Sequence, residues 1–232
     1  MSNVTIAARP STGQSIGEWF TSHWFATFAI VYGLWIWLPW LAPVMMQFEQ
    51  SEAGKAIYFV YSLFCHQLPE RSFFLFGPQT MYSLSDIQAA WQTTLSPMVL
   101  RRFIGNDAMG WKVAWSDRMV SFYTTVWLTA IAWWPLRRKI RPLPWWGFAL
   151  MLLPMVLDGV THAASDFNGL GRGFRDSNDW LLALTENSLP LAYAGDALGS
   201  FNSWARLLTG ILAGLGITWF AFPHLERSFA QD

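Results

Sequence analysis

The sequence predicts an all-α membrane protein, a multi-pass bundle of transmembrane helices, from three observations. Of its 232 residues, 53% are hydrophobic and 13% are charged, whereas soluble domains carry about 25% charged residues. Long uncharged apolar segments recur along the chain, and a helix needs about 20 such residues to cross the hydrocarbon core. The 16 tryptophans are the third observation, because indole rings favour the membrane–water boundary.

The charge balance argues against a nucleic-acid-binding protein, and the cysteine count rules out an intramolecular disulfide. The formal net charge is zero, which argues against a nucleic-acid partner because nucleic-acid binding relies on a basic surface. Cys65 is the only cysteine, so an intramolecular disulfide cannot form.

A single transmembrane domain is predicted over residues 20–232, with extramembrane loops at residues 65–111 and 163–200. Residues 1–19 are predicted to be a polar tail, because the N-terminus lacks the basic stretch and apolar core of a secretory signal. The first apolar segment should therefore remain as a membrane anchor.

The first predicted span runs from about Trp24 to Met46 and carries no charge. Pro39 and Pro43 lie in its last third, where proline kinks or ends a helix. The next apolar segment, residues 53–64, is too short to cross a membrane, so we expect a short interfacial helix there. A tilted span over residues 53–76 is the alternative, and it would bury two charged side chains.

Two short helices are expected within the polar, turn-rich residues 77–110. One follows Ser85, and the other covers residues 96–103, where a serine N-cap and a proline in the first turn favour a helix start. These helices are interpreted as an extramembrane elaboration.

Three further spans are predicted in the second half of the chain. They cover residues 112–134, 144–162 and 201–222. The last one contains Gly210-x-x-x-Gly214, and small residues at this spacing let helix backbones approach closely. The bundle therefore has four spans plus the short interfacial helix, or five spans if residues 53–76 cross.

The orientation follows from the basic loop at residues 135–143. It contains Arg137, Arg138, Lys139 and Arg141 and no acidic residue. Short loops rich in lysine and arginine remain on the cytoplasmic side, so this loop and the C-terminus are predicted to be cytoplasmic. Four spans place the N-terminus there too, whereas five would place it outside.

This topology gathers polar residues near the outer membrane boundary, where we predict one shared polar cluster. Its members are Cys65, His66, Gln67, Arg71, Asp117, Arg118, Asp158, His162, Asn202 and Arg206. Ionisable groups at membrane depth pair with one another or line wet cavities, and they often mark function. Asp158 and His162 are four residues apart and share a helix face, and we expect Asp158 to meet Arg206 or Arg118.

Four motifs along the chain resemble a known family. They are Phe-Cys-His-Gln-x-x-x-Arg-Ser-Phe at residues 64–73, Gly-x-Lys-Val-Ala-x-Ser-Asp-Arg at 110–118 followed by Tyr123, Pro-Met-x-x-Asp-Gly-x-Thr-His at 154–162, and Asn-x-x-x-Arg-x-x-Thr-Gly at 202–210. Their order is similar to that of DUF2085, an uncharacterised family of bacterial integral membrane proteins.

The resemblance implies a protein of the bacterial cytoplasmic (inner) membrane and supplies no reaction. Relatives tend to carry cysteine where this chain has Ser116, so a two-thiolate metal site is not available here.

Two functions remain open. The first is a non-catalytic accessory or structural subunit, which contacts the lipid bilayer and other subunits of a membrane complex. It is favoured because no catalytic motif is found and because extramembrane additions usually serve contacts. The second is an enzyme or ligand-binding protein that uses Cys65, His66, Asp158 and His162 at the outer boundary. A divalent metal ion held by His66, Asp158 and His162 is the possible cofactor.

Overall fold

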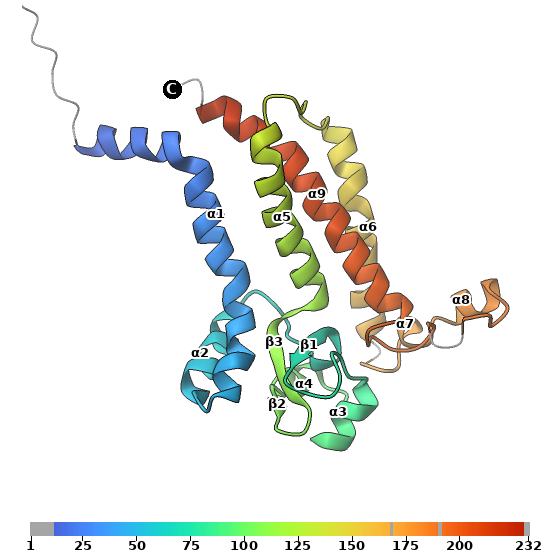
Figure 1. Ribbon diagram of the computed structural model, residues 1–232. Helices are drawn as coiled ribbons and strands as arrows, with labels where there is room; N and C mark the ends of the chain where they lie inside the picture. The colour runs from blue at the N-terminus through green and yellow to red at the C-terminus, as the bar shows by residue number, and fades with distance from the viewer. Residues whose placement is uncertain (1–11, 168, 190–191, 230–232) are drawn as a thin grey trace, which may run out of the picture.

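Long helices dominate the computed structural model, which describes residues 12–167, 169–189 and 192–229. The long ones are α1 (Thr12–Gln47), α5 (Asp117–Leu136), α6 (Trp145–Asp166) and α9 (Phe201–Phe229). Helix α9 packs against both α5 and α6, and α1 lies beside α5 (Figure 1). The protein is therefore mostly helical, as predicted.

Among the residues that the structure describes, three helices are long and apolar enough to cross a membrane. They are Ile16–Gln47 in α1, Trp145–Asp166 and Phe201–Phe229. Large apolar side chains on their surfaces are exposed, such as Leu34 at 69% and Leu150 at 59%, which is the pattern of a lipid-facing surface. Helix α5 has 20 residues but is not among these three candidate spans.

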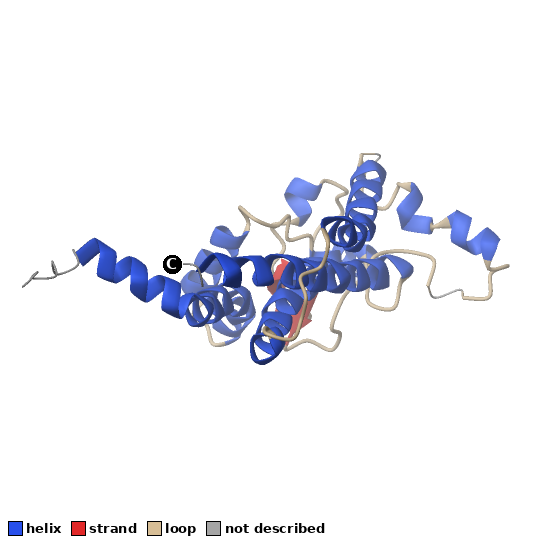
Figure 2. Cartoon of the chain, turned by 90° about the horizontal axis from the view of Figure 1, so that it is seen from above, coloured by secondary structure: helices blue, strands red, loops and turns tan. Residues whose placement is uncertain are grey.

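Helix α1 bends once near its beginning. His23 has non-helical dihedral angles, with φ −116° and ψ 15°. The residues before it extend away from the other helices (Figures 1 and 2). Pro39 and Pro43 were expected to kink or end the first span, and the helix continues through both to Gln47.

The segment after α1 does not form one continuous helix. Helix α2 covers Ser51–Tyr61, 11 residues, which is about 16 Å of helix and half the hydrocarbon thickness. The chain then forms the short 3-10 helix η1 (Pro69–Arg71) and the strand β1 (Ser72–Leu75). The tilted span over residues 53–76 was therefore the wrong alternative.

A small antiparallel sheet corrects the all-α prediction. Its order is β1-β3-β2, with β2 at Gly105–Asn106 and β3 at Gly110–Ser116. Residue Ser72 pairs with Ser116, and Phe74 pairs with Lys112. The predicted second span began at residue 112, but α5 begins at Asp117. The start of this span was predicted too early because a short apolar segment such as β3 cannot be distinguished from a turn of helix by its hydrophobic pattern.

Short helices occur in both segments predicted to be extramembrane, residues 65–111 and 163–200. The first segment contains α3 (Leu84–Ala90) and α4 (Pro97–Leu100), and the second contains α7 (Phe174–Ser177) and α8 (Asp179–Leu184). Helices α3 and α4 confirm the two expected between residues 77 and 110. Ser83 and Asp86 form a capping box at the start of α3, so this helix begins slightly earlier than predicted.

The small residues of α9 face α5. An added Cβ at Gly210 would lie 2.2 Å from Ser121 Oγ, and one at Gly214 would lie 2.8 Å from the carbonyl oxygen of Phe122. The motif predicted to let backbones approach therefore lies at the contact between these two helices.

Candidate functional site

A network of arginine and aspartate side chains lies where α5 begins, α6 ends and α9 begins. It consists of Arg71, Arg118, Arg175 and Arg206 with Asp117, Asp158, Asp166 and Asp196, and His162 and Asn202 lie among them. The same ends of the helices meet the two segments predicted to be extramembrane (Figure 1). We call this set the arginine–aspartate network.

Arg206 occupies the centre of the network and is 2% exposed. Its Nε donates to both carboxylate oxygens of Asp117, at 2.8 and 2.9 Å. Its Nη1 donates to Asp196 Oδ1 at 2.5 Å, and its Nη2 donates to the Asp196 carbonyl oxygen at 2.6 Å. Arg206 therefore joins α9 to the start of α5 and to the loop before α9.

Asp158 on α6, like Arg206 on α9, pairs with two residues of opposite charge. Its two carboxylate oxygens accept hydrogen bonds from two arginines, Arg118 Nη2 and Arg175 Nη2, both at 2.6 Å. Asp158 lies eight residues before the end of α6, about 12 Å along the helix. Because an unpaired charge at that depth is costly, these two ion pairs account for its position.

His162 lies one helical turn after Asp158 and is 3% exposed. Its Nδ1 lies 3.1 Å from the Asp158 carbonyl oxygen, and its Nε2 lies 3.4 Å from Arg206 Nη1. The imidazole therefore fills the space between the Asp158 pairs and the Arg206 pairs.

Arg71 connects the segment of residues 65–111 to the network. Its Nη1 and Nη2 donate to the two oxygens of Asp166, each at 2.8 Å, and its Nε donates to Asp196 Oδ2 at 2.8 Å. Burial alone raises the pKa of Asp196, but Arg71 and Arg206 outweigh burial and hold that pKa well below its usual range.

Two asparagines complete the loop side of the network. Asn202 Oδ1 accepts from Arg175 Nε at 3.0 Å, and its Nδ2 donates to the carbonyl oxygens of Arg175 and Gly195. Asn178 Nδ2 donates to the carbonyl oxygens of Arg175 and Tyr193. The backbone carbonyl groups of Arg175 and Gly195 are thereby attached to the start of α9.

The structure brings together seven of the ten predicted cluster residues: Arg71, Asp117, Arg118, Asp158, His162, Asn202 and Arg206. Of the two arginines expected to meet Asp158, Arg118 makes the ion pair. Arg206 pairs with Asp117 and Asp196 instead.

Sequence reasoning missed Asp166, Arg175 and Asp196. All three lie at or within the polar residues 163–200, which were interpreted as a loop. The available signal was the excess of acid in that loop, five acidic against two basic residues, since such an excess beside buried arginines favours ion pairing.

Cys65, His66 and Gln67 lie apart from the network contacts. Cys65 is 8% exposed and belongs to an apolar cluster that includes Tyr61 and Trp115. His66 is exposed. Gln67 is buried, and its Nε2 donates to the Tyr58 carbonyl oxygen at 2.9 Å.

The expected metal ligands are not assembled in one place. His162 and Asp158 are neighbours, with Nδ1 3.3 Å from Oδ1, but His66 is exposed on a different segment. Across residues 12–167, 169–189 and 192–229, no three His, Cys, Asp or Glu side chains are arranged to hold a metal ion. The metal site stays a prediction.

Two more titratable side chains are buried beside the network. Glu70 is 2% exposed, and neither carboxylate oxygen has a hydrogen-bond partner among the described residues. Burial raises the pKa of Glu70 to about 7, although Arg71 partly opposes this. Lys112 is fully buried and donates to the carbonyl oxygens of Gln67 and Arg101. Burial lowers its pKa to about 7.

Comparison with known proteins gives one match. A family model described as a predicted membrane protein, DUF2085, matches residues 108–220. These residues run from two positions before β3 into α9 and include three of the four motifs noted in the sequence, while the motif at residues 64–73 lies outside. No curated protein and no solved structure matches the chain.

Proposed function

We propose that this chain, whose residues 108–220 match the DUF2085 family of predicted membrane proteins, is a non-catalytic structural subunit of a complex in the bacterial cytoplasmic membrane. Its task is to present a rigid outer surface, formed by residues 65–111 and 163–200, to a partner subunit. The arginine–aspartate network holds those two segments on the helix ends.

The mutual pairing of the network's charges carries this proposal. Its four arginines and four aspartates form ion pairs with one another across α5, α6, α7, α9 and the loops. A catalytic or ligand site keeps a reactive group open to its substrate. Here every arginine and every aspartate of the network already forms at least one ion pair, which is the arrangement expected of a cross-link between segments.

The proposed topology has four spans, namely α1, α5, α6 and α9. Helix α5 qualifies because it packs against both α1 and α9 and because 20 residues extend about 30 Å. The basic residues 137–141 lie at the opposite end of the helices from the network (Figure 1). By the positive-inside rule, that end and the C-terminus are cytoplasmic and the network faces outward.

The alternative is an enzyme or metal-binding protein built on Cys65, His66, Asp158 and His162. It has less support, because Cys65 packs in an apolar cluster and His66 lies on the surface. Asp158 already pairs with two arginines.

Co-purification from native membranes tests the proposed function. The tagged chain is extracted with a mild detergent, and we expect a partner protein in fixed stoichiometry. Met98 is an exposed apolar residue of the first segment, 64% exposed, so Met98→Glu should release the partner without lowering the unfolding temperature. The control Phe59→Glu changes an exposed residue of α2 and should retain it. A lone monomer with catalytic turnover would contradict the proposal.

A further inference from the structure

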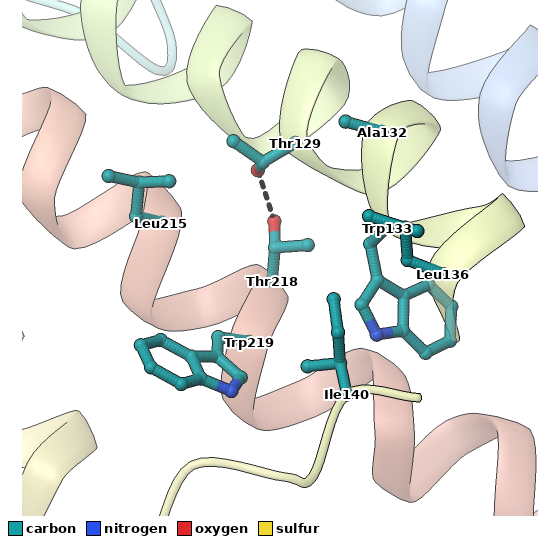
Figure 3. A pocket seen from close by; sticks show the side chains of 8 residues that line it. All are labelled: Thr129, Ala132, Trp133, Leu136, Ile140, Leu215, Thr218 and Trp219. Carbon is teal, nitrogen blue, oxygen red and sulfur yellow. Dashed lines mark hydrogen bonds between the residues drawn. The ribbon is translucent and has the colours of Figure 1, made fainter. Parts of the chain in front are cut away.

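A pocket with apolar walls opens between α5 and α9, close to the ends that carry the basic loop. Its volume is about 390 Å³, and its walls include Leu136, Ile140, Leu215 and Trp219. Figure 3 shows Thr129 and Thr218 hydrogen-bonded to each other, at 2.8 Å, between these walls. Both hydroxyl groups also bond backbone carbonyl oxygens of α5. The pocket therefore suits an apolar occupant.

A second pocket continues from the first and is strongly basic. Its volume is about 320 Å³, and it is lined by Arg137, Arg138, Lys139, Arg141 and Arg227, with Glu226 as the acidic member. Trp133 and Ile140 line both pockets, so the two spaces adjoin. Glu226 accepts from Arg137 at 3.1 Å. The positive charge in this pocket therefore exceeds the negative charge.

A buried donor lies at the junction of the two pockets. Trp133 is 4% exposed, and its indole Nε1 has no hydrogen-bond partner among the described residues. The other pocket tryptophan, Trp219, donates to the Arg141 carbonyl oxygen at 2.8 Å. Because a buried donor without an acceptor is costly, Trp133 Nε1 is a donor that a ligand acceptor at the junction would satisfy.

We propose that these joined pockets bind one anionic phospholipid of the cytoplasmic leaflet. An acyl chain lies in the apolar pocket, the phosphate lies among the arginines, and an ester carbonyl between them accepts from Trp133 Nε1. The order of groups in the lipid, apolar chain, carbonyl and phosphate, matches the order of the three features along the protein. The inference rests on the proposed orientation, which places this end at the leaflet that is rich in anionic lipid.

A phospholipid fits better than a soluble phosphate. Leu136 and Leu215 are 46% and 39% exposed at the rim of the apolar pocket, so the pocket communicates with the lipid-facing surface. A soluble anion would use the basic pocket and leave both the apolar pocket and the Trp133 donor unoccupied.

Lipid titration of the delipidated full chain in detergent tests the proposal. The probes are phosphatidylglycerol, phosphatidylcholine with the same acyl chains, and inorganic phosphate, followed by native mass spectrometry and by the unfolding temperature. We expect one phosphatidylglycerol to bind with clear preference over phosphatidylcholine and to raise the unfolding temperature, while phosphate alone has no effect. Equal binding of the two lipids, or an equal effect of phosphate, would overturn the proposal.

Matched variants assign the contacts. Arg138→Gln and Arg141→Gln should each weaken phosphatidylglycerol binding on the order of fivefold, whereas Arg102→Gln, an exposed arginine at the other end, should not. Trp133→Phe should weaken the binding of both phosphatidylglycerol and phosphatidylcholine, because both lipids have ester carbonyl groups. Unchanged phosphatidylglycerol binding in Arg138→Gln, Arg141→Gln and Trp133→Phe would contradict the assignment. Because partner co-purification does not require this lipid, the two proposals fail separately.

Discussion

Replacing Asp158 with asparagine tests how strongly the network holds the fold. The substitution preserves the shape of the side chain but removes the charge that pairs with Arg118 and Arg175, both at 2.6 Å. Breaking a buried ion pair by removing one partner costs about 3–5 kcal/mol, because the remaining charge stays buried. The side chains of Arg118 and Arg175 are 18% and 11% exposed, so they reach water in part, and we expect a value near the lower limit.

The expected change is large enough to measure in detergent micelles. A loss of about 3 kcal/mol lowers the unfolding temperature of a chain of this size by roughly 6–12 °C. Tryptophan fluorescence during heating reports it, because tryptophans such as Trp115 and Trp133 are buried.

A matched acid-to-amide change supplies the control. Glu52 pairs with Lys55 on the surface, where the two side chains are 89% and 57% exposed. Such pairs contribute about 0–1 kcal/mol, so Glu52→Gln should leave the unfolding temperature almost unchanged. Equal effects of Asp158→Asn and Glu52→Gln would refute the reasoning.

Two further predictions concern Glu70 and Gly210. Because the pKa of Glu70 is raised from 4.5 to about 7, the folded state binds this proton more tightly than the unfolded state. Protonated Glu70 should therefore contribute about 3 kcal/mol to the free energy of unfolding. This contribution should be fully present below pH 4.5 and should be lost as the pH rises through 7. The variant Glu70→Gln should lack this loss in chemical unfolding measured across that range, and an unchanged pH profile would contradict the assignment. An added methyl group at Gly210 would lie 2.2 Å from Ser121 Oγ, so Gly210→Ala should lower the unfolding temperature by several degrees. An added Cβ at Gly17 has no neighbour within 4 Å, so Gly17→Ala should not lower it, and similar effects at both sites would argue against close packing of α5 and α9.

The helical part of the fold could be predicted because its cause is local. Long apolar segments predict helices wherever they occur, and α1, α6 and α9 lie where those segments are. The strand β3 could not be predicted in this way, because its pairing with β1 joins residues about 40 positions apart, such as Ser72 and Ser116. Pairing between distant segments leaves no periodic signal in a short apolar run.

Part of the arginine–aspartate network could also be predicted, because some of its contacts depend only on local helix geometry. Asp158 and His162 share a helix face at four-residue spacing, and that relation depends only on helix geometry. Asp196 contacts Arg71 and Arg206 because the loop before α9 folds back over the helix ends. The path of a loop is set by its contacts in three dimensions, so its pairing was not visible in the sequence.

The coupling between Asp117 and Arg206 measures most directly whether the network binds the helices together. Asp117 is fully buried and Arg206 is 2% exposed, and their side chains join α5 to α9. Unfolding free energies of the wild type, Asp117→Asn, Arg206→Gln and the double variant form a double-mutant cycle. We expect a coupling energy of about 2 kcal/mol or more between the two sites. A coupling energy near zero, with the single effects simply adding, would show that this ion pair does not hold α5 to α9.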